Sequence, residues 1–247
     1  MISRILHRSM IVALGCTVFA AGAQAQLSAK PQQAEKQIKE KIQQVERDVD
    51  SIVKSMKEAK KARIDAPAPD FTLIDTEGKE HRLSDYIASG KVVVLEWFNP
   101  QCPYVREHYN AEGKGTSTTL EKEFAEHNVV WLRINSGSEK SRTSGKELNE
   151  QFRKEWKITG PVLLDPEGKV GMAYGAKVTP TMFVITTEGI IAYEGALDSD
   201  PSPSKTGEEI YVRSALKSVL AGETVEKKQT KAVGCSVKYA AKARPRG

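Results

Sequence analysis

Residues 92–109, VVVLEWFNPQCPYVREHY, decide the fold and contain the residue on which the chemistry depends. Residues 92–95 are a continuous apolar run rich in β-branched side chains, which is typical of a strand buried on both faces of a parallel or mixed sheet. An Asn-Pro pair ends this strand, and Pro103 favours the first position of a helix. Cys102 is therefore predicted to lie at a helix N-terminus, where free backbone N–H groups and the helix dipole stabilise a thiolate.

The composition limits the classes of function. The chain has 247 residues, of which 39% are hydrophobic, and a formal net charge of +5. This length favours one domain, or two, with appended segments. The positive excess lies mainly in the end segments, so we expect no nucleic-acid partner. The sequence shows no dinucleotide- or phosphate-binding glycine pattern and no metal-ligand cluster among its four histidines, so we expect neither a cofactor nor a metal.

Residues 1–25 have the features of a secretory signal peptide. Two arginines precede an apolar segment at 10–23, and Ala23-Gln24-Ala25 has the small-x-small pattern of a cleavage site. We therefore expect a periplasmic or secreted bacterial protein that is cleaved near Ala25. The alternative is a lipoprotein signal through Cys16, although the residues before this cysteine fit that signal poorly.

Cleavage near Ala25 leaves two cysteines, Cys102 and Cys235, in a compartment where disulfides persist. An even count fits one intramolecular bridge. The bridge would be either a structural staple, worth about 4 to 5 kcal/mol for so long a loop in the chain-entropy model, or a redox pair. The cysteine count alone leaves both possibilities open.

Residues 32–63 contain no glycine or internal proline and are predicted to form one long polar helix. We treat residues 26–65 as a helical spacer or coiled coil. A homodimer through residues 38–59 is one interpretation, and an amphipathic spacer helix is the other, because three heptads are marginal for a free coil. Both rest on apolar residues spaced alternately four and three apart, as in an a/d heptad seam: Ile38, Ile42, Val45, Val49, Ile52 and Met56.

An Ala-Pro-Ala-Pro segment at 66–69 ends this helix and begins a domain predicted to span residues 66–222. Strand-like and helical segments alternate, which implies an α/β fold with parallel pairing through crossovers. Residues 223–247 are predicted to be a flexible, basic tail that carries Cys235. The expected strands are 71–74, 80–83, 92–95, 129–134, 162–164, 182–185 and 190–193. One expected helix starts at 103, and the others span 118–126, 144–156, 170–174 and 208–221.

Several motifs follow one another in a characteristic order: APDFTL at 68–73, GK at 78–79, LSD at 83–85, Cys102-Pro103, LDPEGK at 164–169 and Thr179-Pro180. Together they resemble the thioredoxin-like redoxin family, of the alkyl hydroperoxide reductase and thiol-specific antioxidant type. The resemblance implies a thioredoxin-like α/β fold with a central mixed sheet flanked by helices, here with a long N-terminal helix and a C-terminal tail. The segment GCSVKY at 234–239 is similar to a signature of an exported subgroup.

The resemblance also implies roles for individual residues. Cys102 matches the attacking cysteine of the thioredoxin C-x-x-C motif, whereas Val105 replaces the second cysteine. Thr179-Pro180 matches the cis-proline loop, which in the family lies against the active cysteine and offers backbone groups to an extended disulfide substrate. Pro103 is expected beside this substrate site. From the residues alone, a cis bond before Pro180 would be uncommon.

Glu96 falls where thioredoxins carry a buried acid beneath the active site. There a raised pKa would let its carboxyl group exchange a proton with a thiol. The alternative is an end-of-strand glutamate that faces solvent. Asn99 departs from the family, because a typical peroxiredoxin has a hydroxyl residue at this position. Arg106 has two interpretations: it lies near the thiolate, or it is simply exposed.

We predict an exported thiol-based oxidoreductase in which Cys102 attacks a disulfide or a peroxide and Cys235 resolves the resulting mixed disulfide or sulfenic acid. Its partners would be that substrate and a dithiol electron donor of unknown identity. Asn99 weakens the peroxidase interpretation, and Val105 weakens the ordinary reductase one. The alternative from another class is a non-catalytic exported binding module with a structural Cys102–Cys235 disulfide.

Overall fold

The computed structural model describes residues 38–49 and 61–240. These belong to two units, a helical segment described over 38–49 and a domain described over 61–240. None of the helices in these ranges is long and apolar enough to cross a membrane. The predicted signal peptide, with Cys16 and Ala25, lies outside the described residues, and so do Ile52 and Met56 of the heptad pattern.

The described part of the N-terminal helix exposes its apolar seam, with Ile38, Ile42, Val45 and Val49 between 51% and 59% exposed. Dimerisation through this seam stays a prediction. The predicted continuation of the helix to residue 63 is wrong at residues 61–63, which are not helical. Contacts with the domain hold this segment, because the Ala62 N–H donates to the Ala173 carbonyl over 2.9 Å and the side chain of Ala62 packs against the core.

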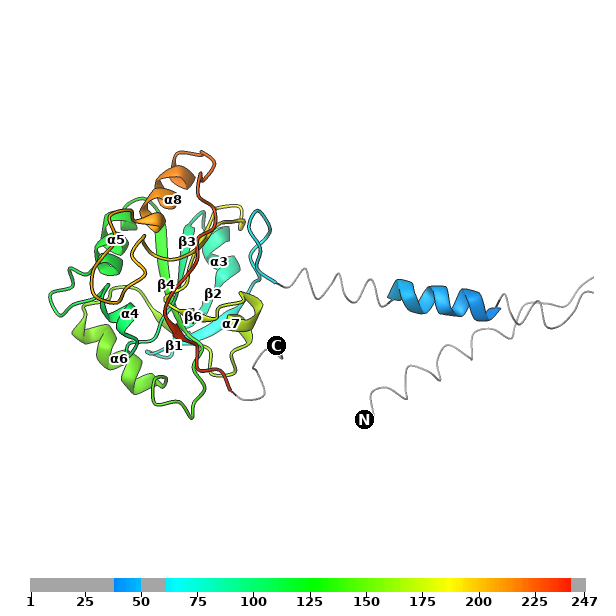
Figure 1. The fold of residues 1–247 in the computed structure, drawn as a ribbon, viewed down its shortest axis with the longest axis horizontal. Coiled ribbons are helices and arrows are strands. Elements are labelled where there is room, and N and C mark those ends of the chain that lie inside the picture. Colours follow the sequence, from blue (N-terminus) through cyan, green and yellow to red (C-terminus); the bar gives the residue numbers. More distant parts are fainter. Residues whose placement is uncertain (1–37, 50–60, 241–247) are drawn as a thin grey trace, which may run out of the picture. The chain divides into compact units, whose positions relative to one another are not determined.

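A seven-stranded sheet forms the centre of the domain, in the order β2-β1-β5-β4-β3-β7-β8 (Figure 1). The sheet is mixed. Strand β4 pairs in parallel with β3 and β5, and all other neighbouring strands of the sheet pair antiparallel. This confirms the predicted fold class. The strands are β1 (Thr72–Asp75), β2 (Glu80–Arg82), β3 (Val92–Trp97), β4 (Val129–Asn135), β5 (Val162–Leu164), β7 (Met182–Ile185) and β8 (Ile191–Gly195).

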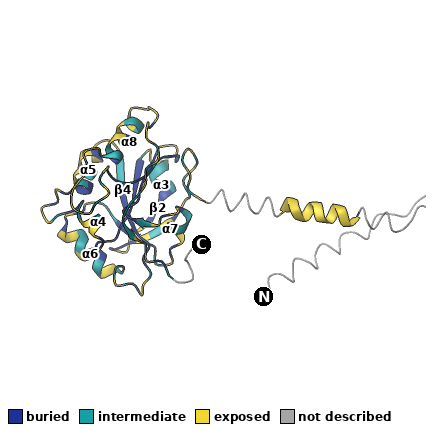
Figure 2. Ribbon diagram, viewed as in Figure 1, coloured by how far each residue is buried: buried dark blue, intermediate teal, exposed yellow. Residues whose placement is uncertain are grey.

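Strand β3 is central because both of its faces are covered, as its apolar run predicts. Val93, Leu95 and Trp97 face the layer of α3 (Leu83–Ala88) and α7 (Lys169–Ala173). Val92 and Val94 face the layer of α5 (Thr116–Ala125) and α8 (Tyr211–Leu220). Alternate side chains of a strand point to opposite faces, and Figure 2 shows the central strands mostly in the colour of buried residues, with helices of mixed exposure around them.

A third cluster lies beyond the end of β3 and contains the side chains that surround Cys102. Helix α4 (Pro103–Arg106) contributes Val105, and Trp156 follows α6 (Lys146–Glu155). Phe98 and Tyr109 complete the aromatic part, with the Tyr109 and Trp156 rings stacked at a centroid separation of 4.9 Å. The end of β3 beside Cys102 is therefore supported by packed aromatic rings.

The segment after α8 is not a flexible tail over its described residues, which corrects the prediction for residues 223–240. Its backbone pairs with β8 at Glu194. It then forms β9 (Cys235–Ser236), which pairs antiparallel with β6 (Val178–Thr179) in a separate two-stranded sheet. The Tyr239 hydroxyl donates to the Ala176 carbonyl over 2.7 Å. In Figure 1 this segment, in red, crosses the front of the domain. The polar composition of this segment gave no sign of docking, because backbone pairing and a few side chains such as Val225 and Tyr239 hold it.

Candidate active site

Cys102 occupies the position that its sequence context predicts. It is the N-cap residue of α4, with Pro103 at the start of the helix. The chain reaches it through a tight turn in which the Cys102 N–H donates to the Asn99 carbonyl over 3.0 Å. The Asn99 side-chain oxygen accepts the Gln101 N–H, also over 3.0 Å. Asn99 thus stabilises the turn that presents the cysteine.

The loop that contains Thr179 and Pro180 lies directly against Cys102. The Cys102 thiol donates a hydrogen bond to the Thr179 carbonyl over 3.1 Å. The Thr179–Pro180 peptide bond is cis, as the family resemblance implies. Thr179 is buried, and Cys102 itself is only 1% exposed.

Strand β9 brings the second cysteine to the same place. Cys235 stands opposite Thr179 in the β6–β9 ladder, and it packs against the cluster that contains Cys102. Both cysteines are free thiols in this structure. Burial and the neighbouring Cys102 thiol raise the pKa of Cys235 to about 11. This shift disfavours the thiolate form of Cys235.

The position of the missing second C-x-x-C cysteine is filled by an apolar side chain. Val105 is fully buried among aromatic rings. Arg106 is exposed, with its guanidinium 5.9 Å from the centroid of the Phe152 ring, which bears out the simpler of the two alternatives for this arginine. Pro103 is exposed at the start of α4. Cys235 is thus the second thiol at this site.

Glu96 is fully buried, so the solvent-facing alternative is wrong. Its Oε2 accepts hydrogen bonds from the Tyr109 hydroxyl over 2.7 Å and from the Trp131 indole N–H over 2.8 Å. Arg133 Nε lies 3.8 Å from the same oxygen. Burial raises the pKa of Glu96, and the Arg133 guanidinium opposes that shift. Among the described residues Glu96 makes no hydrogen bond to either thiol.

Sequence reasoning missed Arg133, the cation of this buried network. Its Nη2 donates to Glu121 Oε2 over 2.9 Å, and its Nε donates to the Tyr109 hydroxyl over 2.7 Å. A signal was present, because β3 and β4 are both apolar strands that carry one charged residue each. The parallel register places Glu96 directly beside Arg133. Opposite charges at one level of two buried strands predict an ion pair.

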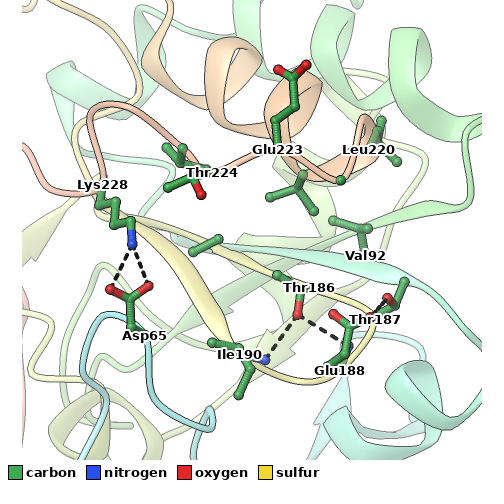
Figure 3. Close-up of a pocket in the computed structure, with 14 residues that line it drawn as sticks. Asp65, Val92, Thr186, Thr187, Glu188, Ile190, Leu220, Glu223, Thr224 and Lys228 are labelled. Atoms are coloured by element: carbon green, nitrogen blue, oxygen red, sulfur yellow. Dashed lines mark hydrogen bonds and ion pairs between the residues drawn. The ribbon is translucent and has the colours of Figure 1, made fainter.

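A cavity of about 200 Å³ adjoins the site, lined in part by Tyr104, His108, Pro180, Asp198 and Val233. His108 is buried, and its Nδ1 lies 3.9 Å from Asp198 Oδ2. A second cavity, of about 550 Å³, lies at the opposite end of β3, where Lys228 is ion-paired with Asp65 (Figure 3). The distant cavity shares no residue with the cysteine site, whereas the smaller cavity includes Pro180 of the cis-proline loop.

Stability is expected to depend on pH through Glu107. Burial and the nearby Asp198 and Asp200 raise its pKa from 4.5 to about 7. Between these values the folded chain holds a proton that the unfolded chain has lost, so stability is lost as pH rises through this window. Chemical denaturation at pH 5 and at pH 8 should show that the free energy of unfolding falls less between these two pH values for Glu107→Gln than for the natural chain. Substitution of the exposed Glu155 by Gln is the control. Equal losses for Glu107→Gln and the natural chain would contradict this account.

Comparisons with known proteins agree with this geometry. A family model, the AhpC/TSA family, matches residues 64–194. The thiol-disulfide oxidoreductase ResA of Geobacillus thermodenitrificans is 32% identical over 133 residues, which are 51% of this chain and 65% of that protein. The thiol:disulfide interchange protein DsbE of Allochromatium vinosum is 25% identical over 138 residues, 55% of this chain and 69% of that protein. The alignment with ResA thus spans slightly less than two thirds of that relative's length.

Two solved structures share the fold across the domain. An uncharacterized conserved protein from Geobacillus kaustophilus gives a TM-score of 0.64 at 26% identity, covering 72% of this chain and 93% of that chain. A hypothetical protein from Sinorhizobium meliloti 1021 gives a TM-score of 0.64 at 24% identity, covering 72% and 96%. These matches and the mixed sheet establish the thioredoxin-like fold.

Proposed function

Because this chain belongs to the AhpC/TSA family, we propose that it is an exported thiol-disulfide oxidoreductase whose redox pair is Cys102 and Cys235. One observation carries the proposal. The β6–β9 ladder sets Cys235 opposite Thr179, and the Thr179 carbonyl accepts the hydrogen bond from the Cys102 thiol. Two cysteines far apart in sequence thus meet at the cis-proline loop, although the local C-x-x-C pair is missing.

The reaction begins with the Cys102 thiolate, which attacks one sulfur of a substrate disulfide. The substrate S–S bond breaks, a mixed disulfide forms on Cys102, and the released substrate thiolate takes up a proton. Cys235 then loses its proton and attacks the Cys102 sulfur. This step forms the Cys102–Cys235 disulfide and releases the second substrate thiol. Two electrons have passed to the substrate, and a dithiol donor must supply two more to restore the starting state.

The other site residues have supporting roles in this proposal. Thr179 and Pro180 offer the backbone against which the substrate disulfide is held, and Pro103 sets the start of the helix at Cys102. Glu96 acts as a positioning residue through Tyr109, whose ring packs in the cluster around Cys102. The charged network behind the cluster would thereby keep the aromatic support of the cysteine in place.

Two observations favour a disulfide over a peroxide as the substrate. Asn99 has no hydroxyl group, which a typical peroxiredoxin has at this position, and its side-chain oxygen is engaged within the turn by the Gln101 N–H. The aligned relatives are named for thiol-disulfide chemistry, and their alignments include more than half of this chain. Location outside the cytoplasm follows from the predicted signal peptide and from the need for a compartment where disulfides persist.

Replacement of Cys235 should stop the reaction at its intermediate. With Cys235→Ser, a peptide disulfide should form a mixed disulfide with Cys102 that persists, because an external thiol must replace a resolving thiol held in the same chain. We expect resolution to slow by about 100-fold or more, since intramolecular attack has a large effective concentration. Rapid acid quenching and intact-mass measurement would follow the adduct.

The natural chain provides the companion measurement. Mild oxidation should yield a Cys102–Cys235 peptide in a digest, and a small dithiol should reduce this bridge readily. A bridge that resists a mild dithiol, in a protein that melts when fully reduced, would support the structural-staple alternative instead. Two free thiols after oxidation would remove the intramolecular mechanism.

A further inference from the structure

Residues 231–239, here called the strap, cover the reactive cysteine. Strand β9 of the strap takes the ladder position beside β6, and β6 pairs with no other strand among the described residues. Cys102 is only 1% exposed beneath this arrangement. A polypeptide that must bring a disulfide to Cys102 therefore meets a site already occupied by the chain's own extended segment.

We infer that the strap and an extended, disulfide-bearing polypeptide compete for the same edge of β6, so that such a substrate reaches Cys102 only when the strap has moved. This inference rests on the proposed function for its substrate. The strap would then have two roles, as the cover of the resting site and as the carrier of Cys235 when it returns. A small disulfide, which needs no strand pairing, would depend on strap movement much less.

The closeness of the strap to the loop depends on Gly234. A Cβ atom at this position would lie 2.0 Å from the Thr179 carbonyl oxygen and 2.7 Å from its carbon. Both atoms belong to the backbone, so neither can move aside cheaply. Any larger residue at 234 would push the strap away from β6 and uncover Cys102.

The strap is held at both ends. Before it, the Thr230 hydroxyl accepts the Ala196 N–H over 2.9 Å and lies 2.6 Å from the Tyr193 hydroxyl. At its far end the Tyr239 hydroxyl donates to Ala176. The Tyr239 ring lies so close to Gly168 and Gly171 that a Cβ would come within 2.5 Å of a ring carbon at position 168 and within 2.8 Å of one at position 171.

The middle of the strap is held less firmly than its ends. Its ladder with β6 contains two residue pairs, and Cys235 is only partly buried. Lys231 and Val233 line the cavity of about 200 Å³ beside Pro180. After β9 the Val237 N–H donates to the Lys177 carbonyl over 2.9 Å. Release of the Tyr239 anchor would thus leave β9 held by these few backbone contacts, while Thr230 keeps the strap attached to the domain.

Alkylation of each cysteine in the fully reduced protein tests the inference without any turnover. A bulky maleimide should modify Cys102 slowly in the natural chain. Tyr239→Ala and Gly234→Ala should each raise that rate by about 10-fold or more, because a covered group reacts only from the open population. The alkylation rate of Tyr239→Phe should lie between those of the natural chain and Tyr239→Ala. Leu220→Ala, at an exposed apolar position on α8, should leave the rate unchanged.

Two further arms complete the test. A peptide of residues 232–240 with serine at position 235, added to Tyr239→Ala, should restore slow alkylation of Cys102. In exchange assays the same variant should react faster with a peptide disulfide, by a factor similar to that for alkylation, and little faster with hydroxyethyl disulfide. Thermal unfolding checks that each variant is folded, and Gly234→Ala leaves the Tyr239 anchor intact should Tyr239→Ala fail to fold.

The outcomes separate the two proposals. Fast alkylation of Cys102 in the natural chain, or no acceleration in either strap variant, would overturn the inference that the strap covers Cys102. Slow alkylation that the variants accelerate, together with no exchange with any disulfide, would uphold the strap as a cover and overturn the proposed function.

Discussion

Cys102→Ser is expected to abolish disulfide exchange, with a loss of at least about 1,000-fold in the rate constant for a peptide disulfide. The substituted chain has no thiol at the N-cap of α4, and burial raises the pKa of its remaining thiol, Cys235. A serine hydroxyl can donate to the Thr179 carbonyl as the thiol does, so the fold should persist. Stopped-flow measurement of thiol release would give the rate.

The control is Cys235→Ser, which should keep the first attack and lose only the second. If Cys102→Ser and Cys235→Ser slowed the first attack equally, the assignment of Cys102 as the attacking residue would be wrong. Thermal unfolding of both variants would show whether either loss comes from the fold. The pair thus separates attack from resolution in one protein.

Arg133→Leu should lower the free energy of unfolding by about 3 to 5 kcal/mol, the usual cost of removing one partner of a buried ion pair. Arg133 is fully buried and lies 2.9 Å from Glu121 and 3.8 Å from Glu96. Without the guanidinium, Glu96 must either remain charged in an apolar interior or take up a proton. Urea denaturation at pH 7 would measure the change.

A matched control is Arg213→Leu, which removes an arginine that also pairs with a glutamate at 2.9 Å but lies at the surface. That loss should stay below about 1 kcal/mol, as for other surface ion pairs. The double variant Arg133→Leu/Glu96→Gln should be less destabilised than the sum of its single changes. Simple additivity, or a small loss for Arg133→Leu, would show that the network is not an electrostatic unit.

The sequence predicts the fold well where apolar pattern and position agree. The run at residues 92–95 is the core of β3, and both predicted hairpins are observed as β1–β2 and β7–β8. Helix starts are less accurate: α8 begins at Tyr211 rather than at 208. The residues from 208 satisfy the helical pattern, but local backbone contacts decide where a helix begins.

The site is predicted in part. Cys102, Thr179 and Pro180 meet as expected because neighbouring strands bring them to one end of the sheet. The docking of residues 223–240 was not predictable from polarity, since it depends on backbone hydrogen bonds to Glu194 and Lys177 and on the Tyr239 anchor. The roles of Tyr109 and Arg133 were missed because each depends on a partner from another element, which spacing along the chain does not reveal.

In the proposed mechanism, the replacement of the local cysteine by Val105 changes what the redox pair depends on. In a C-x-x-C motif the two thiols remain neighbours by chain connectivity, even when the protein unfolds. Here tertiary contacts such as the β6–β9 pairing bring Cys102 and Cys235 together, so their effective concentration is a property of the tertiary structure. Thermodynamic linkage follows: whatever stabilises the folded domain also favours the bridge over the dithiol, and the bridge stabilises the domain in return.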